Sequence, residues 1–292
     1  MFHLRRILAL ASNTVTQLLR MKVLFFLLAF CVLVVAAGFA FPAVSEAQQL
    51  KLLKDVSFGA LQAFAVVMAI ASTALLLPKD VEDRTLYTIL AKPVPRIDYL
   101  LGKYLGVIAL IAGGLILMDA AFSLVLYIKQ TIVIKEAVDW FVHQQQGQAD
   151  AAGIAAVTAD LEKQGLTWSL HTAVWSIFLK AAVLTALALL ISTIASSTLF
   201  TIITGFAFFV IGHGLGLFRD YFFQGGISRW DYALSAVLSI LCPDLGLFDI
   251  VDPVLEGHVP SVMAMSTMTG FAVLYIVGYL TVAHLLFVEK EL

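Results

Sequence analysis

The sequence predicts an all-α integral membrane protein built as a bundle of six membrane-spanning helices. Apolar residues make up 61% of the 292 residues and charged residues only 13%, which leaves too little polar surface to cover a soluble domain. A helix needs about 20 mostly apolar residues to cross the hydrocarbon, whereas a transmembrane barrel would show alternating segments of about 10 residues. The stretches that qualify as helical spans are 23–41, 58–77, 100–127, 174–195, 199–218 and 262–287.

The first 22 residues are expected to form a helix that lies on the cytoplasmic membrane surface. Apolar residues recur there at helical spacing, opposite Arg5 and Arg6, a pattern typical of an interfacial amphipathic helix. The apolar run that follows is longer than the core of a secretory signal peptide. We therefore interpret it as a retained span.

Lysine and arginine residues predict that both termini face the cytoplasm. Ten of them lie in the segments on that side, and seven lie on the other side across roughly twice as many residues. The positive-inside rule then places 79–98 in the cytoplasm and places 129–173 and 219–261 outside the cytoplasmic (inner) membrane of a bacterium.

The two longer exterior segments are expected to contain helices of their own. Apolar residues within 151–166 share one helix face, and Asp150 precedes them as a candidate N-cap, which predicts an interfacial helix. Residues 232–242 are apolar but too short to cross, and Pro243 ends them, so we expect a pair of shallow re-entrant or interfacial helices. The acidic residues that follow are expected to form a solvated rim: Asp244, Asp249, Asp252 and Glu256.

Segment 79–98 is dense in charge and predicts a short amphipathic helix between the second and third spans. Pro78 ends the preceding span, and Asp80 can cap a new helix. Pro93 and Pro95 push the residues before them toward extended geometry and so end it. A solvated loop that merely obeys the positive-inside rule explains the same residues equally well.

The same segment carries a resemblance to a known family. Residues 82–106 (EDRTLYTILAKPVPRIDYLLGKYLG), 242–249 (CPDLGLFD), 257–259 (GHV) and 287–292 (FVEKEL) resemble the permeases of ABC-2 type transporters. The similarity is closest to the branch that contains the permease of the nitrous-oxide reductase maturation system. It extends over the whole six-span plan.

The resemblance implies a coupling helix that docks into a groove of a separate cytoplasmic ABC ATP-binding subunit. It also implies a second copy or a paralogue of the permease as partner in the bilayer. Glu82 matches the family's acidic position, whereas Pro95 departs from its commoner small polar residue and changes the expected turn. The residues expected to meet the ATPase are Asp80, Glu82, Asp83, Arg84, Thr85, Leu86, Ile89, Pro93, Arg96 and Lys103.

Catalytic motifs are missing from the sequence. Gly102-Lys103 lacks the upstream glycine of a phosphate loop, so we expect the partner to bind ATP and Mg²⁺ and this chain to bind no cofactor. The scattered histidines form no metal or hydrolytic motif, so no enzymatic activity is expected. The net charge of −2 carries no information about nucleic acid, and no such partner is expected.

Two other function classes stay open. An ion-driven secondary transporter would be expected to show repeat symmetry or paired broken helices, and neither is evident. A membrane scaffold or mechanical transmitter without a transport pathway fits the same sequence features.

Asp119 and Lys180 are charges inside apolar runs, where each would cost roughly 2.5–3.5 kcal/mol near a helix centre. Counting 1.5 Å per residue from the outer ends of their spans places them roughly 12 Å and 9 Å deep. This similar depth predicts an ion pair between the third and fourth spans. Alternatively, Lys180 extends to the outer surface and Asp119 lines a wet cavity.

Two pairs of glycines predict close helix packing. Gly102 and Gly106, like Gly212 and Gly216, have the small-xxx-small spacing that lets helix backbones approach each other. We expect packing within the chain rather than a dimer contact.

Overall fold

The computed structural model describes residues 2–20, 25, 29–30, 32–36, 46–76, 95–145, 150–195, 197–224 and 242–289. These residues are helical apart from short connections and contain no strand, which confirms the all-α class for this part of the chain. Its helices long and apolar enough to cross a membrane are Gln48–Leu76, Arg96–Gln144, Ala151–Ile194, Thr198–Leu215 and Val262–Glu289. Most of the predicted first span, 23–41, lies outside the described residues, so the six-span count stays a prediction.

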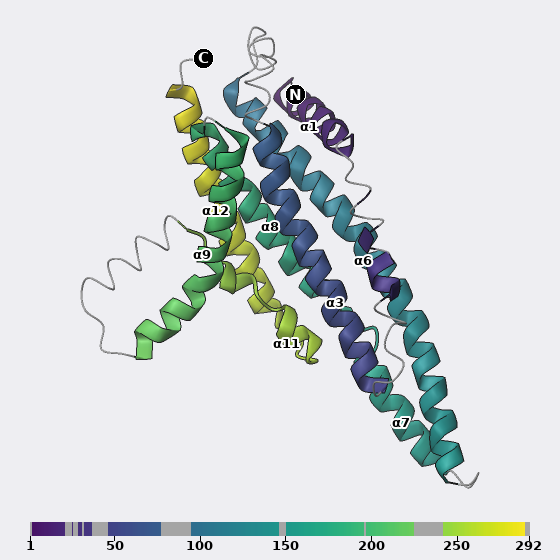
Figure 1. The fold of residues 1–292 in the computed structure, drawn as a ribbon. Coiled ribbons are helices and arrows are strands. Elements are labelled where there is room, and N and C mark those ends of the chain that lie inside the picture. Colours follow the sequence, from purple (N-terminus) through teal and green to yellow (C-terminus); the bar gives the residue numbers. More distant parts are fainter. Residues whose placement is uncertain are drawn as a thin grey trace.

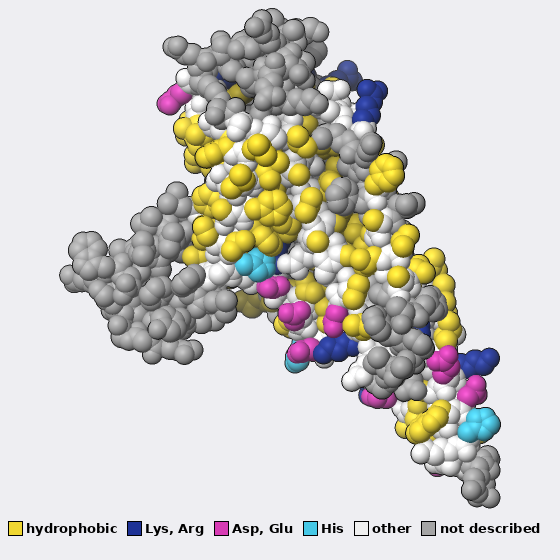
Figure 2. Space-filling view, in the orientation of Figure 1, with side chains coloured by type: hydrophobic (Ala, Val, Ile, Leu, Met, Phe, Trp, Pro, Cys, Tyr) yellow, Lys and Arg dark blue, Asp and Glu magenta, His cyan; other side chains and the backbone are white. Residues whose placement is uncertain are grey.

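Helix α8 (Trp168–Ile194) is the centre of the bundle. It contacts α3 (Glu46–Val67), α6 (Arg96–Gln144), α9 (Thr198–Gln224) and α12 (Val262–Glu289) (Figure 1). Its sequence is apolar on every face, as expected for a helix surrounded by others. Helices α9 and α12 instead expose much of their apolar surface. Figure 2 shows apolar side chains over the middle of the bundle and charged side chains toward its ends.

Helix α1 (Phe2–Leu19) forms where the sequence predicts a helix before the first span. It runs alongside the first turns of α6, and Gly102 and Gly106 permit this contact. A Cβ at Gly102 would lie 2.5 Å from the Leu10 Cβ, and a Cβ at Gly106 would lie 2.5 Å from the Thr14 Cβ. The predicted packing role of this glycine pair is therefore confirmed, while the expectation of a helix flat on the membrane surface remains a prediction.

Helix α3 begins at Glu46, well before the predicted start of the second span at residue 58. It leads into a π-helical turn, η1 (Met68–Ser72), and the helix then continues to Leu76. The π-helical turn is buried against α6, α8 and α9. Gly205 of α9 allows this approach, since a Cβ there would lie 2.8 Å from Ile70 Cγ2.

Helix α6 is unbroken over 49 residues, a length of about 73 Å. The predicted span ends at residue 127, but the helix continues to Gln144. The chain then returns as α7 (Ala151–Gln164), antiparallel to the end of α6 (Figure 1). The predicted helix and its cap are confirmed, because the Asp150 side chain accepts hydrogen bonds from the backbone N–H groups of Ala152 and Gly153. The close pairing of α7 with α6 was not anticipated.

The chain between α9 and α12 enters the bundle. Its described part contains the 3₁₀ helix η2 (Leu245–Phe248) and the short helix α11 (Val251–Leu255). Apolar side chains of η2 are buried against α8 and α9, and those of α11 against α8 and α3. We call residues 242–255 the re-entrant segment. The other predicted shallow helix, 232–242, lies almost entirely outside the described residues.

Candidate functional site

The predicted ATPase-binding residues divide between described and undescribed parts of the chain. Arg96 and Lys103 lie in the first two turns of α6. The coupling helix itself stays a prediction, because the residues that would form it lie outside the described ranges: Asp80, Glu82, Asp83, Arg84, Thr85, Leu86, Ile89 and Pro93.

Arg96 joins the start of α6 to the end of α12. Its Nη1 donates hydrogen bonds to the carbonyl oxygens of Phe287 and Val288 at 2.6 and 2.7 Å. Carbonyls in the last turn of a helix have no partner within the helix, and they favour a nearby cation. The guanidinium also lies 5.8 Å from the centre of the Phe287 ring, and that ring stacks on Tyr99 of α6. Arg96 therefore has a structural role at this helix end.

The same turns of α6 are tied to α1. Asp98 is buried, and its Oδ2 lies 2.9 Å from Nδ1 of His3. Lys103 Nζ lies 3.5 Å from Oε1 of Gln17 and 5.6 Å from the centre of the Tyr99 ring. We call this region, where α1, the first turns of α6 and the last turn of α12 meet, the α1–α6–α12 junction.

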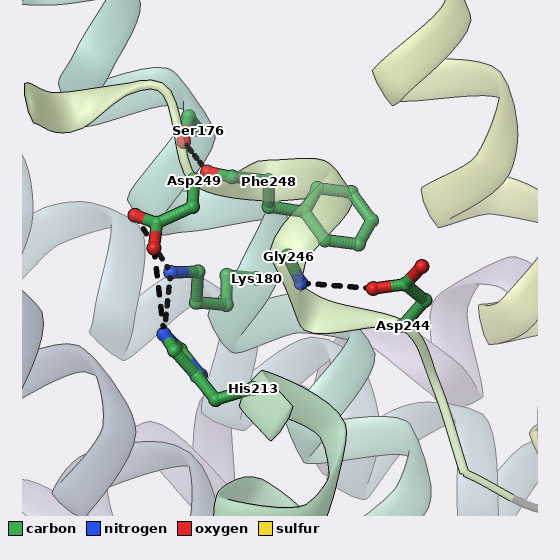
Figure 3. Close-up of polar contacts among 7 residues, drawn as sticks. All are labelled: Ser176, Lys180, His213, Asp244, Gly246, Phe248 and Asp249. Carbon is green, nitrogen blue, oxygen red and sulfur yellow. Dashed lines mark hydrogen bonds and ion pairs between the residues drawn. The ribbon is translucent and has the colours of Figure 1, made fainter. Parts of the chain in front are cut away.

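A second group of polar residues lies inside the bundle, where α8, α9 and the re-entrant segment meet (Figure 3). Lys180 of α8 is 1% exposed. Its Nζ lies 3.6 Å from Oδ1 of Asp249 and 3.5 Å from Nε2 of His213. The same His213 nitrogen is 3.8 Å from the other Asp249 oxygen. We call these three residues the Lys180 cluster. It gives a buried ammonium group a carboxylate partner, as a charge in a low-dielectric interior requires.

Backbone contacts hold the re-entrant segment in place beside this cluster. The Ser176 hydroxyl, one turn from Lys180 on α8, donates to the Phe248 carbonyl. Asp244 caps η2 by accepting a hydrogen bond from the Gly246 N–H at 3.1 Å. Gly212 lets α9 approach, since a Cβ there would lie 2.7 Å from the Pro243 carbonyl oxygen. The predicted close packing at Gly212 is thus confirmed, between a helix and the re-entrant segment.

The predicted ion pair between Asp119 and Lys180 is wrong. Asp119 Oδ2 instead lies 2.8 Å from Nδ1 of His171, at the start of α8. Because His171 and Lys180 are nine residues apart on one helix, they are separated by about 13.5 Å along its axis. The prediction took residues 127 and 174 as matching outer ends, but α8 starts at Trp168 and α6 extends to Gln144. Lys180 does not extend to the outer surface either, since it points inward to Asp249.

Sequence reasoning missed His213 and Asp249 as partners of Lys180. The sequence places Asp249 in a solvated acidic rim, and its side chain is 42% exposed although it contacts Lys180. Asp244 of the same rim is buried. One sequence pattern could have indicated this partner: apolar and acidic residues alternate after Pro243. The apolar residues of such a segment pack in the core and bring the carboxylates between them close to it. A lysine inside a span needs such a partner.

Asp119 and His171 line a cavity of about 220 Å³ between α6 and α8, whose other walls are apolar. The second Asp119 oxygen, Oδ1, is buried and has no hydrogen-bond partner within the described structure. In the same described residues, no group of three or more histidine, cysteine, aspartate or glutamate side chains could hold a metal ion. The Asp119–His171 pair therefore joins α6 to α8 at one wall of this cavity.

The described helices, apolar and arranged around a buried α8, define a multi-pass membrane protein. Residues 8–292 match the family model of ABC-2 family transporter proteins, so the chain belongs to this family. A search of the curated proteins finds no match. Members of the family are transmembrane permease subunits of ABC transporters, generally non-catalytic, and they normally work with ATP-binding subunits.

Proposed function

We propose that the chain is the permease subunit of an ATP-driven ABC transporter in the bacterial inner membrane, with both termini in the cytoplasm. Separate cytoplasmic subunits bind ATP and Mg²⁺ and dock on segment 79–98, and a second copy or a paralogue of the permease completes the transmembrane pair. ATP hydrolysis then drives substrate export or transmits force across the membrane. Family membership supports the class, and the sequence resemblance supports the branch that contains the permease of nitrous-oxide reductase maturation.

The α1–α6–α12 junction carries this proposal. Segment 79–94 leads directly into α6 through Pro95 and Arg96, and the first turns of α6 are bonded to α1 and to the end of α12. A partner that pushes on the segment therefore moves three helices as one unit. Helix α6 is unbroken, so the displacement reaches the opposite end of the bundle.

Such a movement would alter the contacts of the Lys180 cluster, which lies among α8, α9 and the re-entrant segment. It joins the re-entrant segment to α8 and α9 through contacts of 3.5–3.8 Å, longer than a charge-assisted hydrogen bond of about 2.7–2.9 Å. Contacts of this length leave room for the side chains to rearrange without separating, because loss of the Asp249 carboxylate would leave a buried ammonium without an acidic partner. The re-entrant segment can then shift slightly relative to α8 while Lys180 keeps its partner.

An ion-driven secondary transporter fits the described helices less well. Such carriers place paired broken helices at corresponding positions of two repeats. Within the described spanning helices, the π-helical turn of α3 has no counterpart in a second half of the chain.

Co-purification tests the proposal directly. The permease carrying Glu82→Lys should insert normally but lose its ATP-binding subunit. The change removes a carboxylate that favours the start of a helix, and the new lysine repels a basic groove on the subunit. Glu162→Lys, at an exposed position of α7, makes the same charge change elsewhere and should retain the subunit. If Glu82→Lys retains the subunit in the wild-type ratio, docking through this segment is refuted.

A further inference from the structure

A polar pocket of about 250 Å³ lies where α3, α7 and α11 meet, apart from both sites described above. Its lining residues are Gln48, Lys51, Lys54, Gln164, Leu255 and Glu256. Polar side chains of α3, of the last residue of α7 and of Glu256, which follows α11, thus line one space. Figure 2 shows charged side chains of both signs near the edge of the apolar surface on this side of the bundle.

Lys54 gives the pocket a buried ammonium group. The residue is 7% exposed, and its Nζ donates a hydrogen bond of 2.9 Å to the carbonyl oxygen of Gln164, the last residue of α7. A lysine ammonium has three donors, so two remain to reach an acceptor in the pocket. Lys51, one turn earlier on α3, adds a second and exposed ammonium. Together they give the pocket two cationic groups.

The depth of these lysines matches the phosphate layer of a bilayer. The apolar run of the second span begins at Phe58, so Lys54 and Lys51 lie about 6 Å and 10 Å beyond it along the helix. The headgroup region extends roughly 5–8 Å beyond the hydrocarbon on each side. Lys54 lies within this layer, and Lys51 lies just beyond it, from where its long side chain can extend back to a lipid phosphate.

Glu256 narrows the choice of ligand. Its carboxylate lines the same pocket and would repel a purely anionic group, but it offers a partner for a cation next to the phosphate. We propose that the pocket binds the headgroup of a zwitterionic phospholipid, with the phosphate on Lys51 and Lys54 and the ammonium on Glu256. Bound there, the lipid bridges α3 to the end of the re-entrant segment at Leu255.

Lipid retention by the purified full-length permease, measured by native mass spectrometry, tests the proposal with three lipids of the same acyl chains. Phosphatidylethanolamine has both charges, phosphatidylglycerol lacks the ammonium, and diacylglycerol lacks the phosphate as well. Retention should fall in that order. Lys51→Gln should lower retention of both phospholipids about fivefold, which is what one lysine contributes near an anionic lipid surface.

Glu256→Gln tests the ammonium contact apart from the phosphate contact. It should lower the retention of phosphatidylethanolamine to the level of phosphatidylglycerol, and it should leave the retention of phosphatidylglycerol unchanged or raise it. Lys163→Gln, at an exposed position of α7 outside the pocket, is the control and should change nothing. Equal retention of all three lipids, or an equal loss in the control, would overturn the proposal. Displacement of bound lipid by an equal concentration of free phosphoethanolamine would also overturn it, by assigning the pocket to a soluble ligand.

Discussion

Lys180 of α8 and Asp249 of the re-entrant segment form an ion pair whose two members are unequally buried. The Lys180 side chain is 1% exposed and the Asp249 side chain 42%. Water can therefore solvate the aspartate when the pair is broken but cannot reach the lysine. Removal of one partner should consequently cost more than removal of the other.

We expect Asp249→Ala to destabilise the protein more than Lys180→Met. Loss of the carboxylate leaves a buried ammonium without an acidic partner, at a cost of about 3 kcal/mol, whereas loss of the lysine leaves a half-exposed carboxylate. Thermal unfolding in detergent measures both. The double variant should recover most of the Asp249→Ala loss, and a larger loss for Lys180→Met would contradict this view of the pair.

Asp119 and His171 should behave as one unit. Each of Asp119→Asn and His171→Leu should reduce the yield of folded protein, because either change leaves a partly buried polar group poorly partnered at a cost of about 1 kcal/mol. The exchange of Asp119→His with His171→Asp should recover part of the loss in size-exclusion profiles. The exchange of Asp119→Lys with Lys180→Asp should not, and recovery there would argue for the pair that the structure lacks.

Gly106→Ala and Gly113→Ala should have opposite effects although both lie in α6. A Cβ at Gly106 would lie 2.9 Å from the Ala11 carbonyl oxygen as well as against Thr14, so α1 must shift, which costs about 1–3 kcal/mol. A Cβ at Gly113 meets nothing within 4 Å and should gain up to about 1 kcal/mol of helix stability. Thermal unfolding, with protease cleavage of α1 as a second measure, separates these results.

Cys242 should resist thiol reagents. It lies outside the spanning helices, and burial, with the Asp244 carboxylate as a smaller cause, raises the pKa of its thiol to about 11. Only the thiolate reacts, and at pH 8 about a thousandth of such a thiol is ionised. In a Cys31→Ser background, maleimide should label Ala151→Cys, an exposed position, and not Cys242. Rapid labelling of Cys242 at pH 8 would show that the re-entrant segment leaves the bundle.

Cysteine labelling also tests the proposed orientation. With Cys31 and Cys242 replaced by serine, cysteines placed singly at Thr88 and Gln148 should react oppositely with an impermeant thiol reagent in intact cells. Position 148 should be labelled and position 88 protected, because the positive-inside rule places 79–98 in the cytoplasm. Labelling at position 88 from outside would reverse the topology.

The spanning helices could be predicted because the signal is a long apolar run. The predicted fifth and sixth spans fall within α9 and α12, and the predicted fourth span ends one residue beyond α8. Ends were harder to predict, since α3 and α6 continue as helices beyond the apolar residues. Apolarity marks where a helix meets lipid, whereas the helix itself ends only where caps or packing end it.

The partners of the buried charges could not be predicted in the same way. Counting residues inward gave Asp119 and Lys180 similar depths, but depth does not determine which helix faces are in contact. Asp249 reaches Lys180 only because the re-entrant segment folds into the bundle. That fold depends on tertiary packing of Leu245 and Phe248, which no local pattern specifies.

Because α6 is long and unbroken, a small tilt at one end of this helix becomes a large displacement at the other end. If the α1–α6–α12 junction serves as the fulcrum, a tilt of about 5° displaces the far tip of a helix of this length by about 6 Å. Because α7 packs along that tip, with Gly153 against Phe141, the two helices would swing together. A rearrangement of only a few degrees at one face of the membrane would thus become a movement as large as a side chain at the other.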